Sequence, residues 1–468
     1  MGLAPAPLPP DEAPAAHPAD PPAPRRLRLP LRTILLFSSP VAGEGFMQML
    51  TSLYLLKYTT DVLGLAPAAM GTILLVSRVW DAVSDPLVGM WSDRTQSRIG
   101  RRRPWILAAA LPVAGSFVLM WAAPAALGRT ATTAWVAVAV VLFYTCRTVF
   151  AVPHDALGAA LSSDYHERNR VFGIRRVFFG VGSILVFVAL DGFLDGVDPR
   201  GHAFRVTAAA GAVTAAAMLL AGAFLRERPE HQGRGSANGL AAWREVVANP
   251  HARLLLGVFF LQQVGLGGVT MMAAYYAEYV LRDASAFVPI MGSLFVCSVV
   301  SIPPWIALGR RFDKKTLLLA AMGLVGATLA SLGFFGEGDE RPLLFVASMA
   351  GIAVGGLDVL FPSLQADVID TDELATDERK EGVYFASWHF AAKSAMGISA
   401  LVAGFALQAS GFVPNVEPSD EVRAAIRATM SIVPLVTYGA GIWLFSRFRL
   451  TREAHADVRR RLGERAAR

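Results

Sequence analysis

The chain has 468 residues, of which 54% are hydrophobic and only 17% are charged. Soluble globular domains carry about 25% charged residues, so this composition argues against a soluble protein. Apolar runs of about twenty residues recur along the chain, and a helix of that length crosses about 30 Å of hydrocarbon. The formal net charge of +6 comes from basic residues between these runs, which indicates membrane topology rather than nucleic-acid binding. We therefore expect an all-α polytopic membrane protein.

Residues 1–30 are rich in proline and alanine without apolar periodicity, so they are predicted to form a disordered tail. Twelve apolar blocks follow, and each predicts one membrane-spanning helix. Their approximate bounds are 33–62, 67–92, 104–126, 132–160, 172–196, 203–224, 252–281, 285–309, 316–336, 342–368, 382–410 and 425–447. A polar linker at 225–250 separates an N-terminal six-helix half, 31–224, from a C-terminal half, 251–447, and a basic tail follows at 448–468.

Basic residues alternate with acidic residues from one loop to the next. Loops after even-numbered helices carry arginine and lysine, as in RTQSRIGRRR after the second helix, whereas alternate loops are acidic, as in DGFLDGVDPRGH. Excess positive charge marks the cytoplasmic side of a membrane. Both termini are therefore predicted to be cytoplasmic, in a plasma (inner) membrane.

A short motif recurs at the same place in each half. GMWSDR follows the second helix and GRRFDK follows the eighth, and both have the form G-x-x-x-D-[RK]. Two repeated six-helix halves are the plan of many secondary transporters. Carboxylates and basic residues at helix ends can pair and cap, so we expect a latch that holds the halves together on the cytoplasmic side. The residues assigned to this gating role are Gly89, Asp93, Arg94, Arg98, Asp313 and Lys314.

Two carboxylates interrupt the second apolar block. Asp81 and Asp85 lie one helical turn apart on one face. Charged groups in the membrane are costly unless paired or hydrated, so they mark ion or substrate paths. The two acids could bind a small cation or share a proton, and a structural ion pair with Arg78 is the alternative. The equivalent positions of the second half hold Ser301 and Trp305, so the architecture does not require acids there.

Two lysines also fall within predicted spans. Lys57 precedes Asp61 by four residues near the end of the first span, and its long side chain is predicted to snorkel to the membrane surface. Lys393 lies in the middle of the eleventh span and cannot easily reach water. It needs a carboxylate, and Asp81 or Asp85 is the candidate partner across the bundle.

Three longer strings resemble one family. RVWDAVSDPLVGMWSDRTQSRIGRRRPW, VPHDALGAALSSDYHERNRVFGIRR and ADVIDTDELATDERKEGVYFASWHFAAKSA are similar to the glycoside–pentoside–hexuronide:cation symporters, the melibiose-carrier-like branch of the major facilitator superfamily. The resemblance extends from about residue 35 to 445. It implies the major facilitator fold of twelve transmembrane helices and the symport of a sugar or glycoside-like solute by alternating access. The expected coupling ion is Na+ or H+, with no other cofactor.

The resemblance also implies a cation site. It comprises Asp81, Asp85, Thr148, Lys393 and Ser84. Lys393 would keep the two acids ionised and leave them when the cation arrives. Ser84 stands where some members have an amide that influences ion choice, so sodium and proton coupling both stay open. The carboxylates are also the expected site of any transported Na+.

The candidate substrate-binding residues depart from the sugar carriers. Arg176 matches a donor to sugar hydroxyls, but Gly45 stands where those carriers have an acid, with Glu44 one residue away. Ala151 occupies a second acidic position, and Asp155 replaces an aromatic residue that stacks on the sugar. The weakened sugar clamp favours, as an alternative, a cation-coupled carrier of an amphipathic lipid resembling a lysophospholipid, or of a drug-like solute.

A membrane enzyme or a receptor is the remaining class. The sequence has no G-x-S-x-G, phosphate-cradling loop or paired metal-ligand motif, so an enzyme is not expected. His154 and His389 are isolated and are predicted to be packed or pore-lining, and Cys146 and Cys297 lie within spans. The expected partners are a small-molecule substrate, the coupling cation and membrane lipids, and the protein is expected to be monomeric.

Overall fold

The computed structural model describes residues 29–161, 165–194, 198–225, 244, 246–376, 381–450 and 452–466. Within these ranges the chain is helical and contains no strand. The disordered tail predicted for residues 1–30 lies almost entirely outside the described residues, as does most of the predicted linker 225–250. The described fold therefore consists of the helices before and after the linker.

The described residues form thirteen α-helices. The first half contains α1 (Leu31–Lys57), α2 (Pro67–Arg94), α3 (Arg103–Trp121), α4 (Arg129–Ala160), α5 (Tyr165–Leu194) and α6 (Pro199–Phe224). The second half contains α8 (Pro250–Tyr275), α9 (Phe287–Arg311), α10 (Lys314–Ser331), α11 (Glu340–Thr376), α12 (Glu381–Ala409) and α13 (Asp420–Ser446), and α14 (Arg452–Ala466) follows. Single π-helical turns extend α1 and α8: η1 (Tyr58–Val62) and η3 (Tyr276–Val280). Short 3-10 turns lie at η4 (Ala284–Ala286) and η5 (Leu332–Phe334).

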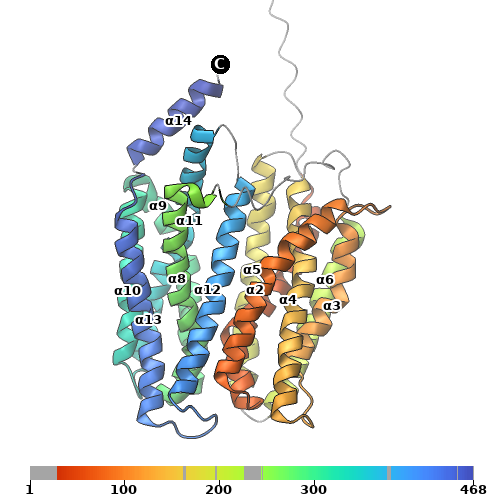
Figure 1. Ribbon diagram of the computed structural model, residues 1–468, viewed down its shortest axis with the longest axis vertical. Helices are drawn as coiled ribbons and strands as arrows, with labels where there is room; N and C mark the ends of the chain where they lie inside the picture. The colour runs from red at the N-terminus through yellow and green to blue at the C-terminus, as the bar shows by residue number, and fades with distance from the viewer. Residues whose placement is uncertain are drawn as a thin grey trace, which may run out of the picture.

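Each predicted span coincides with one long helix, and the predicted all-α fold is confirmed. Ten of the helices are long and apolar enough to cross a membrane, counted over the described residues. The other two are α1 and α2, which have 27 and 28 residues and lie in the same bundle (Figure 1). Charged residues such as Asp81 and Asp85 interrupt the apolar run of α2. The count of twelve spans stays a prediction for these two helices.

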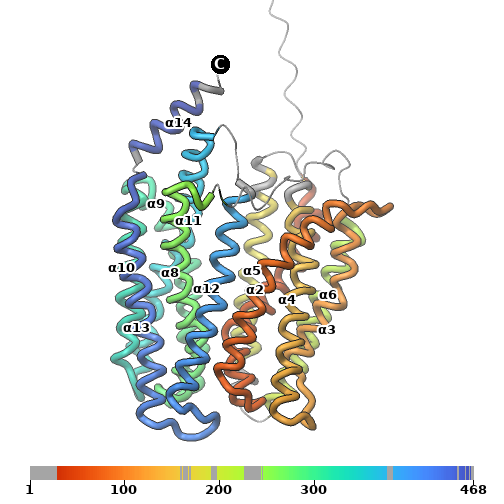
Figure 2. Tube along the Cα trace, in the orientation of Figure 1, coloured from red at the N-terminus to blue at the C-terminus, as the bar shows by residue number. Residues whose placement is uncertain are grey.

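The helices form two groups that lie side by side. Figure 1 shows α2 to α6 in one group and α8 to α13 in the other, and the tube in Figure 2 follows the same division along the chain. The groups meet where α2 packs on α12 and where α1 packs on α8. The two groups therefore meet at an interface, which Lys393 and Lys57 cross with their ion pairs.

The bundle has two chemically different ends. Helices α3 and α10 begin at the end of the bundle near α14, at the top of Figure 1. We call it the basic end, because Arg101–Arg103 and Lys314–Lys315 stand at the starts of these two helices. The opposite end carries the π-helical turns η1 and η3. The C-terminal helix α14 was not predicted within the basic tail at 448–468.

Two arginines of the cluster after α2 cap helices of their own half. Arg102 donates a hydrogen bond to the carbonyl oxygen of Ala156 near the end of α4. Arg103 donates from Nε to the carbonyl of Gly222 at 2.7 Å and from Nη2 to that of Ala223 at 2.5 Å, at the end of α6. The last carbonyls of a helix lack intrahelical partners and carry partial negative charge. These arginines therefore fix α4 and α6 against the start of α3.

Removing this cap should cost stability without changing the transport site. Arg103→Ala is expected to lower the free energy of unfolding by about 1–2 kcal/mol, because it removes charge-assisted hydrogen bonds to two helix-terminal carbonyls. The measurement is thermal unfolding in detergent micelles, with Arg98→Ala as the control, since the Arg98 side chain is exposed in the same cluster. Equal melting temperatures for the two variants would contradict the capping role.

Candidate functional site

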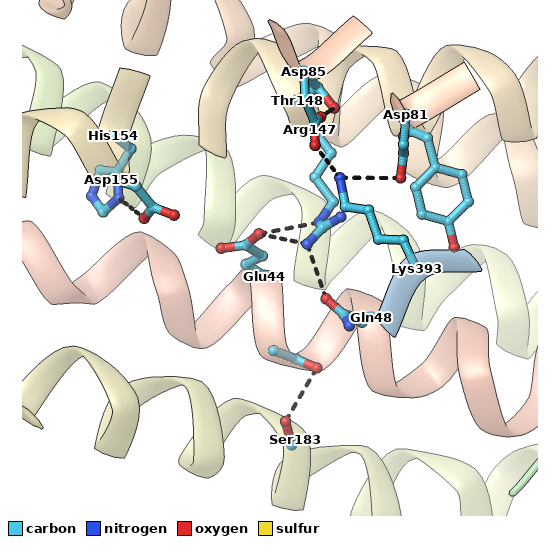
Figure 3. Close-up of polar contacts among 12 residues, drawn as sticks. Glu44, Gln48, Asp81, Asp85, Arg147, Thr148, His154, Asp155, Ser183 and Lys393 are labelled. Carbon is cyan, nitrogen blue, oxygen red and sulfur yellow. Dashed lines mark hydrogen bonds and ion pairs between the residues drawn. The ribbon is translucent and has the colours of Figure 1, made fainter. Parts of the chain in front are cut away.

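Lys393 of α12 joins the two halves near the middle of the bundle. Its Nζ lies 2.5 Å from Oδ2 of Asp85 and 3.4 Å from Oδ2 of Asp81, both on α2 (Figure 3). The contact predicted between this lysine and the paired acids is confirmed. The ammonium occupies a position between two carboxylates, where a small cation would also find oxygen ligands. Its predicted role in ion coupling stays a prediction.

Glycines bring α2 and α12 close enough for this contact. A Cβ atom at Gly71 of α2 would overlap the carbonyl oxygen of Ala400 in α12. A Cβ atom at Gly404 of α12 would overlap the carbonyl oxygen of Pro67 at the start of α2. Small residues allow helix backbones to approach closely in membranes. The backbones of α2 and α12 therefore approach closely between Lys393 and the end of the bundle that carries η1 and η3.

The two acids have different surroundings. The Asp81 side chain is 0% exposed and its Oδ2 also lies 3.4 Å from Arg78 Nη1, so the structural pair considered as an alternative exists beside the Lys393 contact. Its Oδ1 is buried without a hydrogen-bond partner in the described part of the chain. The Asp85 side chain is 33% exposed, and its Oδ1 accepts a hydrogen bond of 2.8 Å from Thr148. Asp85 is thus the accessible acid of the pair.

Two further residues complete the surroundings of Asp81. The Arg78 guanidinium lies 3.9 Å from the ring centroid of Tyr144 and donates a hydrogen bond to its hydroxyl. Ser84 is buried one turn after Asp81, and its Oγ has no hydrogen-bond partner among the described residues. Buried polar atoms without partners are unusual in folded proteins. The oxygens of Ser84 and Asp81 are therefore available to accept a hydrogen bond or a small cation.

A second buried ion pair lies beside this centre and was not predicted. Arg147 of α4 lies 3.0 Å from Oε1 of Glu44 in α1, and its Nη2 donates a hydrogen bond of 3.0 Å to Oε1 of Gln48 (Figure 3). Glu44 is 6% exposed. The signal was available, because Arg147 interrupts the apolar run VLFYTCRTVF just as Asp81 interrupts α2. Glu44, a predicted substrate ligand, is therefore already occupied by an arginine.

The missing acid at Gly45 has a packing reason. A Cβ atom there would overlap the backbone carbonyl oxygen of Phe179 in α5, so this position of α1 accepts no side chain. The hydroxyl of Ser183 in α5 donates a long hydrogen bond of 3.4 Å to the Gly45 carbonyl (Figure 3). The acid one residue earlier is directed toward α4 instead. The close contact between α1 and α5 thus leaves no room at Gly45 for the acid that the sugar carriers have at this position.

Asp155 of α4 forms a third polar pair toward the basic end. Its Oδ1 lies 2.5 Å from Nη2 of Arg175, and half of the Asp155 side chain, 51%, is exposed. The neighbouring His154 is fully buried, is stacked between the rings of Phe37 and Phe150, and bonds the Phe37 carbonyl at 2.9 Å. His154 is therefore packed, as predicted, whereas Asp155 remains reachable.

The other predicted substrate residues differ in polarity. Arg176 is exposed and lies inside α5, which begins at Tyr165. Its guanidinium lies 5.4 Å from the ring centroid of Phe179. Ala151 packs against the hydrophobic core and supplies no polar group. Of these residues, only Arg176 can donate hydrogen bonds to a cargo.

The predicted gating residues of the first half lie at the basic end. Asp93 Oδ1 is 3.5 Å from Arg102 Nη2 and 3.7 Å from Arg101 Nη2. Arg94 and Arg98 are exposed. A Cβ atom at the nearby Gly89 would meet Val152 of α4 at an ordinary 3.7 Å. Asp93 is therefore paired within its own half, and a latch between the halves on this side stays a prediction.

The copy of the motif behaves in the same way. Asp313 caps α10 by accepting a hydrogen bond of 3.2 Å from the backbone N–H of Lys315. Lys314 Nζ lies 2.6 Å from Asp367 of α11. His455 of α14 lies 3.6 Å from the same carboxylate. Lys314 thus joins α10 to α11 within the second half, whereas Asp313 caps the start of α10.

Lys57 contributes to a buried contact between the halves at the opposite end. It is 2% exposed, forms an ion pair with Asp61, and lies 2.6 Å from Oε2 of Glu278 in η3. Its Nζ lies 5.1 and 4.7 Å from the ring centroids of Tyr275 and Tyr279, within cation–π distance. The predicted snorkelling is wrong, because partners from the second half satisfy the ammonium in the interior.

Three hydrogen bonds extend this contact. The hydroxyls of Thr60 and Tyr275 are 2.7 Å apart. Tyr279 donates a hydrogen bond of 2.9 Å to Oδ2 of Asp61. Asn415, in the loop between α12 and α13, adopts φ of +58° and donates from Nδ2 to the Asp61 carbonyl at 2.7 Å. We call the whole set the polar latch, and its members are Lys57, Thr60, Asp61, Tyr275, Glu278, Tyr279 and Asn415.

Comparisons with known proteins agree with this architecture. The family described as MFS/sugar transport protein matches residues 36–452. The chain is 28% identical over 400 residues to an isoprimeverose transporter of Lactiplantibacillus pentosus, covering 83% of this chain and 82% of the relative. It is 26% identical over 445 residues to the sodium-dependent lysophosphatidylcholine symporter 1-A of Danio rerio, covering 86% and 82%.

The fold also matches solved transporter structures. A bacterial homologue of the human lysosomal transporter Spinster superposes with a TM-score of 0.63 at 14% identity, and the match covers 90% of this chain and 98% of that chain. At this identity the likeness concerns the fold alone. The helical bundle, its two halves and the family match over residues 36–452 lead to one conclusion: the chain belongs to the MFS/sugar transport family of membrane transporters and is not an enzyme.

Proposed function

We propose that this protein is a cation-coupled symporter that carries a sugar or glycoside across the membrane by alternating access. The observation that carries the proposal is the contact of Lys393 with Asp81 and Asp85, because it places ionisable groups at the interface of two bundles that would have to move. Such groups within a membrane mark ion paths by default. A relative that is named an isoprimeverose transporter supports a sugar as cargo, and one named sodium-dependent supports coupling to a cation.

If the cation replaced the Lys393 ammonium at the two carboxylates, cation binding would be coupled to the movement of the two halves. Asp85 and Thr148 offer oxygen atoms, and Asp81 offers a carboxylate oxygen without another partner. When Na+ or H+ occupies the acids, the ammonium of Lys393 loses its attraction to them and α12 is less strongly held against α2. The ion would thus weaken a contact between the halves where the cargo must pass.

The orientation of the protein in the membrane follows from the charges at the two ends of the bundle. The basic end is cytoplasmic in this proposal, because excess arginine and lysine mark that side of a plasma (inner) membrane. Leu29, the first described residue, is hydrogen-bonded at 3.1 Å to Glu167 at the start of α5, and α14 lies at the same end, so both termini would be inside. The protein would act as a monomer, since one chain supplies both halves.

The polar latch then closes the outer side. It joins η1 to η3, whereas the accessible charges Asp155 and Arg176 lie closer to the basic end in their helices. Transport would require the latch to open, so it must be strong enough to seal and weak enough to break. Hydrogen bonds and ion pairs that water can replace satisfy both requirements better than a continuous apolar seam.

Loosening the latch should favour the state that is open to the outside. Tyr279→Phe removes the hydrogen bond to Asp61 between the halves, whereas Tyr276→Phe in the same π-helical turn removes a bond of 2.7 Å to Leu332 within one half. We expect a several-fold rise in labelling of a cysteine at Gln48 by a membrane-impermeant reagent added outside, only for Tyr279→Phe. The background would have Cys146→Ser and Cys297→Ser. Equal labelling of the two variants would show that the latch does not control outer access.

A second cargo class has its own support. Gly45 and Ala151 remove two acidic positions of the sugar-carrier pattern, and a relative is named a lysophosphatidylcholine symporter. An amphipathic lipid or drug-like solute is therefore the second candidate. The three polar pairs around the middle of the bundle favour the sugar, because a hydroxylated solute can replace their hydrogen bonds along the path.

Counterflow in proteoliposomes tests the proposal. Vesicles loaded with unlabelled cargo would be diluted into labelled isoprimeverose, a glucuronide or lysophosphatidylcholine, with and without Na+ and at two pH values. We expect accumulation of a sugar or glycoside that a cation stimulates. Exchange of the lipid alone would support the second candidate, and exchange without any ion effect would refute cation coupling.

A further inference from the structure

One intramembrane acid belongs to neither the cation centre nor the polar latch. Asp358 lies in the middle of α11, and its side chain is exposed although every other residue from Gly351 to Phe361 is buried or partly buried. A charged residue in the middle of a span rarely faces lipid and usually lines a path through the protein. The exposed Asp358 side chain therefore indicates a polar region beside the face of α11 on which it lies.

That face is directed toward the other half. On α11, Asp358 lies between Gly355, which packs on α9, and Phe361, whose ring centroid is 5.4 Å from that of Phe259 in α8. Helices α8 and α9 pack on α1 and α5 of the first half, so the Asp358 carboxylate lies on the side of α11 that is turned toward that half. Arg176 is exposed on α5 of the first half. Within the described residues, neither Asp358 nor Arg176 forms an ion pair.

Other charges around the middle of the bundle are already paired. These pairs are Lys393 with Asp85, Arg175 with Asp155, and Arg147 with Glu44. Asp358 and Arg176 therefore differ from their neighbours, because each has hydrogen-bonding capacity to offer to a third molecule. A carboxylate only accepts hydrogen bonds and a guanidinium only donates them.

We propose that Asp358 is a cargo-binding residue that acts with Arg176 to hold a neutral, hydroxylated solute between the halves. The inference rests on the proposed function and names the part of the cargo site that the second half contributes. Neighbouring hydroxyls of a sugar donate to the Asp358 carboxylate, while other hydroxyl or ring oxygens accept from Arg176. This carboxylate replaces, from the opposite half, the acids that are absent at Gly45 and Ala151.

The placement has two consequences for selectivity and movement. An anionic sugar such as a uronide gains an attraction to Arg176 but is repelled by Asp358, so neutral sugars are preferred. A cargo that bridges α5 and α11 also draws the two halves together. Binding of the correct cargo would therefore favour closure of the space in which it sits.

The first test compares cargo affinity and ion dependence in Asp358→Asn, Asp358→Glu and a control. Glu340→Gln serves as the control, because it neutralises an acid at the start of the same helix, away from the proposed site. For Asp358→Asn we expect the KM for counterflow of a neutral glycoside to rise about tenfold, since bonds to a charged acceptor are lost. The cation concentration for half-maximal uptake should change less than about twofold. The ratio of uronide to glycoside transport should rise, because the repelling charge is gone.

The outcomes separate this inference from the function on which it rests. If the wild-type protein exchanges no glycoside, the proposed function fails. If the wild-type protein transports it and Asp358→Asn keeps the same KM and the same preference, only the role of Asp358 is overturned.

A second measurement needs no variant and covers the case in which Asp358→Asn does not fold. A neutral glycoside should slow carbodiimide modification of Asp358 in the wild-type protein, followed by peptide mapping, but should not slow modification of Glu340. No protection at saturating glycoside would overturn the proposal. Protection by lysophosphatidylcholine alone would contradict a sugar as the bound class.

Discussion

Replacement of Asp85 by asparagine is expected to weaken cation-stimulated uptake strongly while leaving the protein folded in the membrane. The Asp85 carboxylate accepts a hydrogen bond from Thr148 at 2.8 Å and lies 2.5 Å from Lys393 Nζ. Asparagine preserves the size of the side chain but removes the charge that attracts a cation. Interactions with a charged group are worth about 1.5–3 kcal/mol, so the apparent cation affinity should fall by about 10- to 150-fold.

The measurement is uptake of an accepted cargo into proteoliposomes over a range of Na+ concentrations and imposed pH gradients. Asp420→Asn is the matched control, because it neutralises a carboxylate that is 99% exposed at the start of α13. The control should retain the wild-type ion dependence. Normal ion dependence in Asp85→Asn would show that the assignment of the cation site is wrong.

Asp81→Asn should give the same loss of coupling together with a loss of stability. The Asp81 side chain is 0% exposed, and the Arg78 beside it is 6% exposed, so the substitution leaves a buried guanidinium with less compensation. Breaking a buried ion pair by removing one partner costs about 3–5 kcal/mol. Asp85→Asn is therefore the cleaner test of function, and a lower melting temperature is expected for Asp81→Asn only.

Most of the fold was predictable because apolar runs long enough to cross a membrane are visible in the sequence. The ends of the helices were less predictable, since polar residues continue a helix beyond the hydrocarbon. The helix α11 reaches Thr376, whereas its span was predicted to end near residue 368. In the same way α5 begins at Tyr165, whereas its span was predicted to begin near residue 172.

Single charges in apolar surroundings made part of the site predictable. Asp81 and Asp85 lie in an apolar span with Arg78 as the nearest basic residue, and Lys393 lies in the middle of another apolar span, so a contact between the lysine and the acids was expected from charge balance. Arg147 and Asp358 carry the same signal but were missed. Neither has an obvious partner nearby in the sequence.

Contacts that depend on the packing of the two halves could not be predicted. Lys57 has Asp61 one turn away, which suggested a local pair at the membrane surface. Glu278 and the rings of Tyr275 and Tyr279 approach it only after α1 and α8 have packed together. Likewise, the hydrogen bond of Arg103 to the end of α6 depends on how α3 packs on α6.

Replacement of Lys393 by alanine is expected to weaken ion coupling and to make transport depend more strongly on pH. The ammonium lies between Asp81 and Asp85 and compensates their charges. Without it, two carboxylates face each other at low dielectric, and binding of a proton relieves their repulsion. Lys393→Arg retains the positive charge and should restore part of the wild-type pH profile. Cargo affinity should change less than ion dependence, because the lysine contacts the acids.

The double substitution of Asp85→Asn with Lys393→Ala decides whether Lys393 acts through Asp85. In Asp85→Asn the ammonium has lost one of its partners, so removing it afterwards costs less than removing it from the wild-type protein. The combined loss of cation-dependent uptake should therefore be smaller than the sum of the two single losses, by about 0.5–3 kcal/mol as for residues in direct contact. Uptake would be measured from about pH 5.5 to 8, a window around neutrality in which perturbed membrane acids titrate.

A double substitution of two residues that do not touch each other serves as the control for additivity. Lys315 at the basic end bonds the carbonyls of Ser446 and Phe448, far along the chain from the acids of α2, so Lys315→Ala combined with Asp85→Asn should be additive. If Lys393→Ala is additive with Asp85→Asn to the same degree, and if its pH profile is unchanged, the ammonium does not control the acids in transport. The contact between the halves would then serve packing alone, and the coupling ion would have to bind elsewhere.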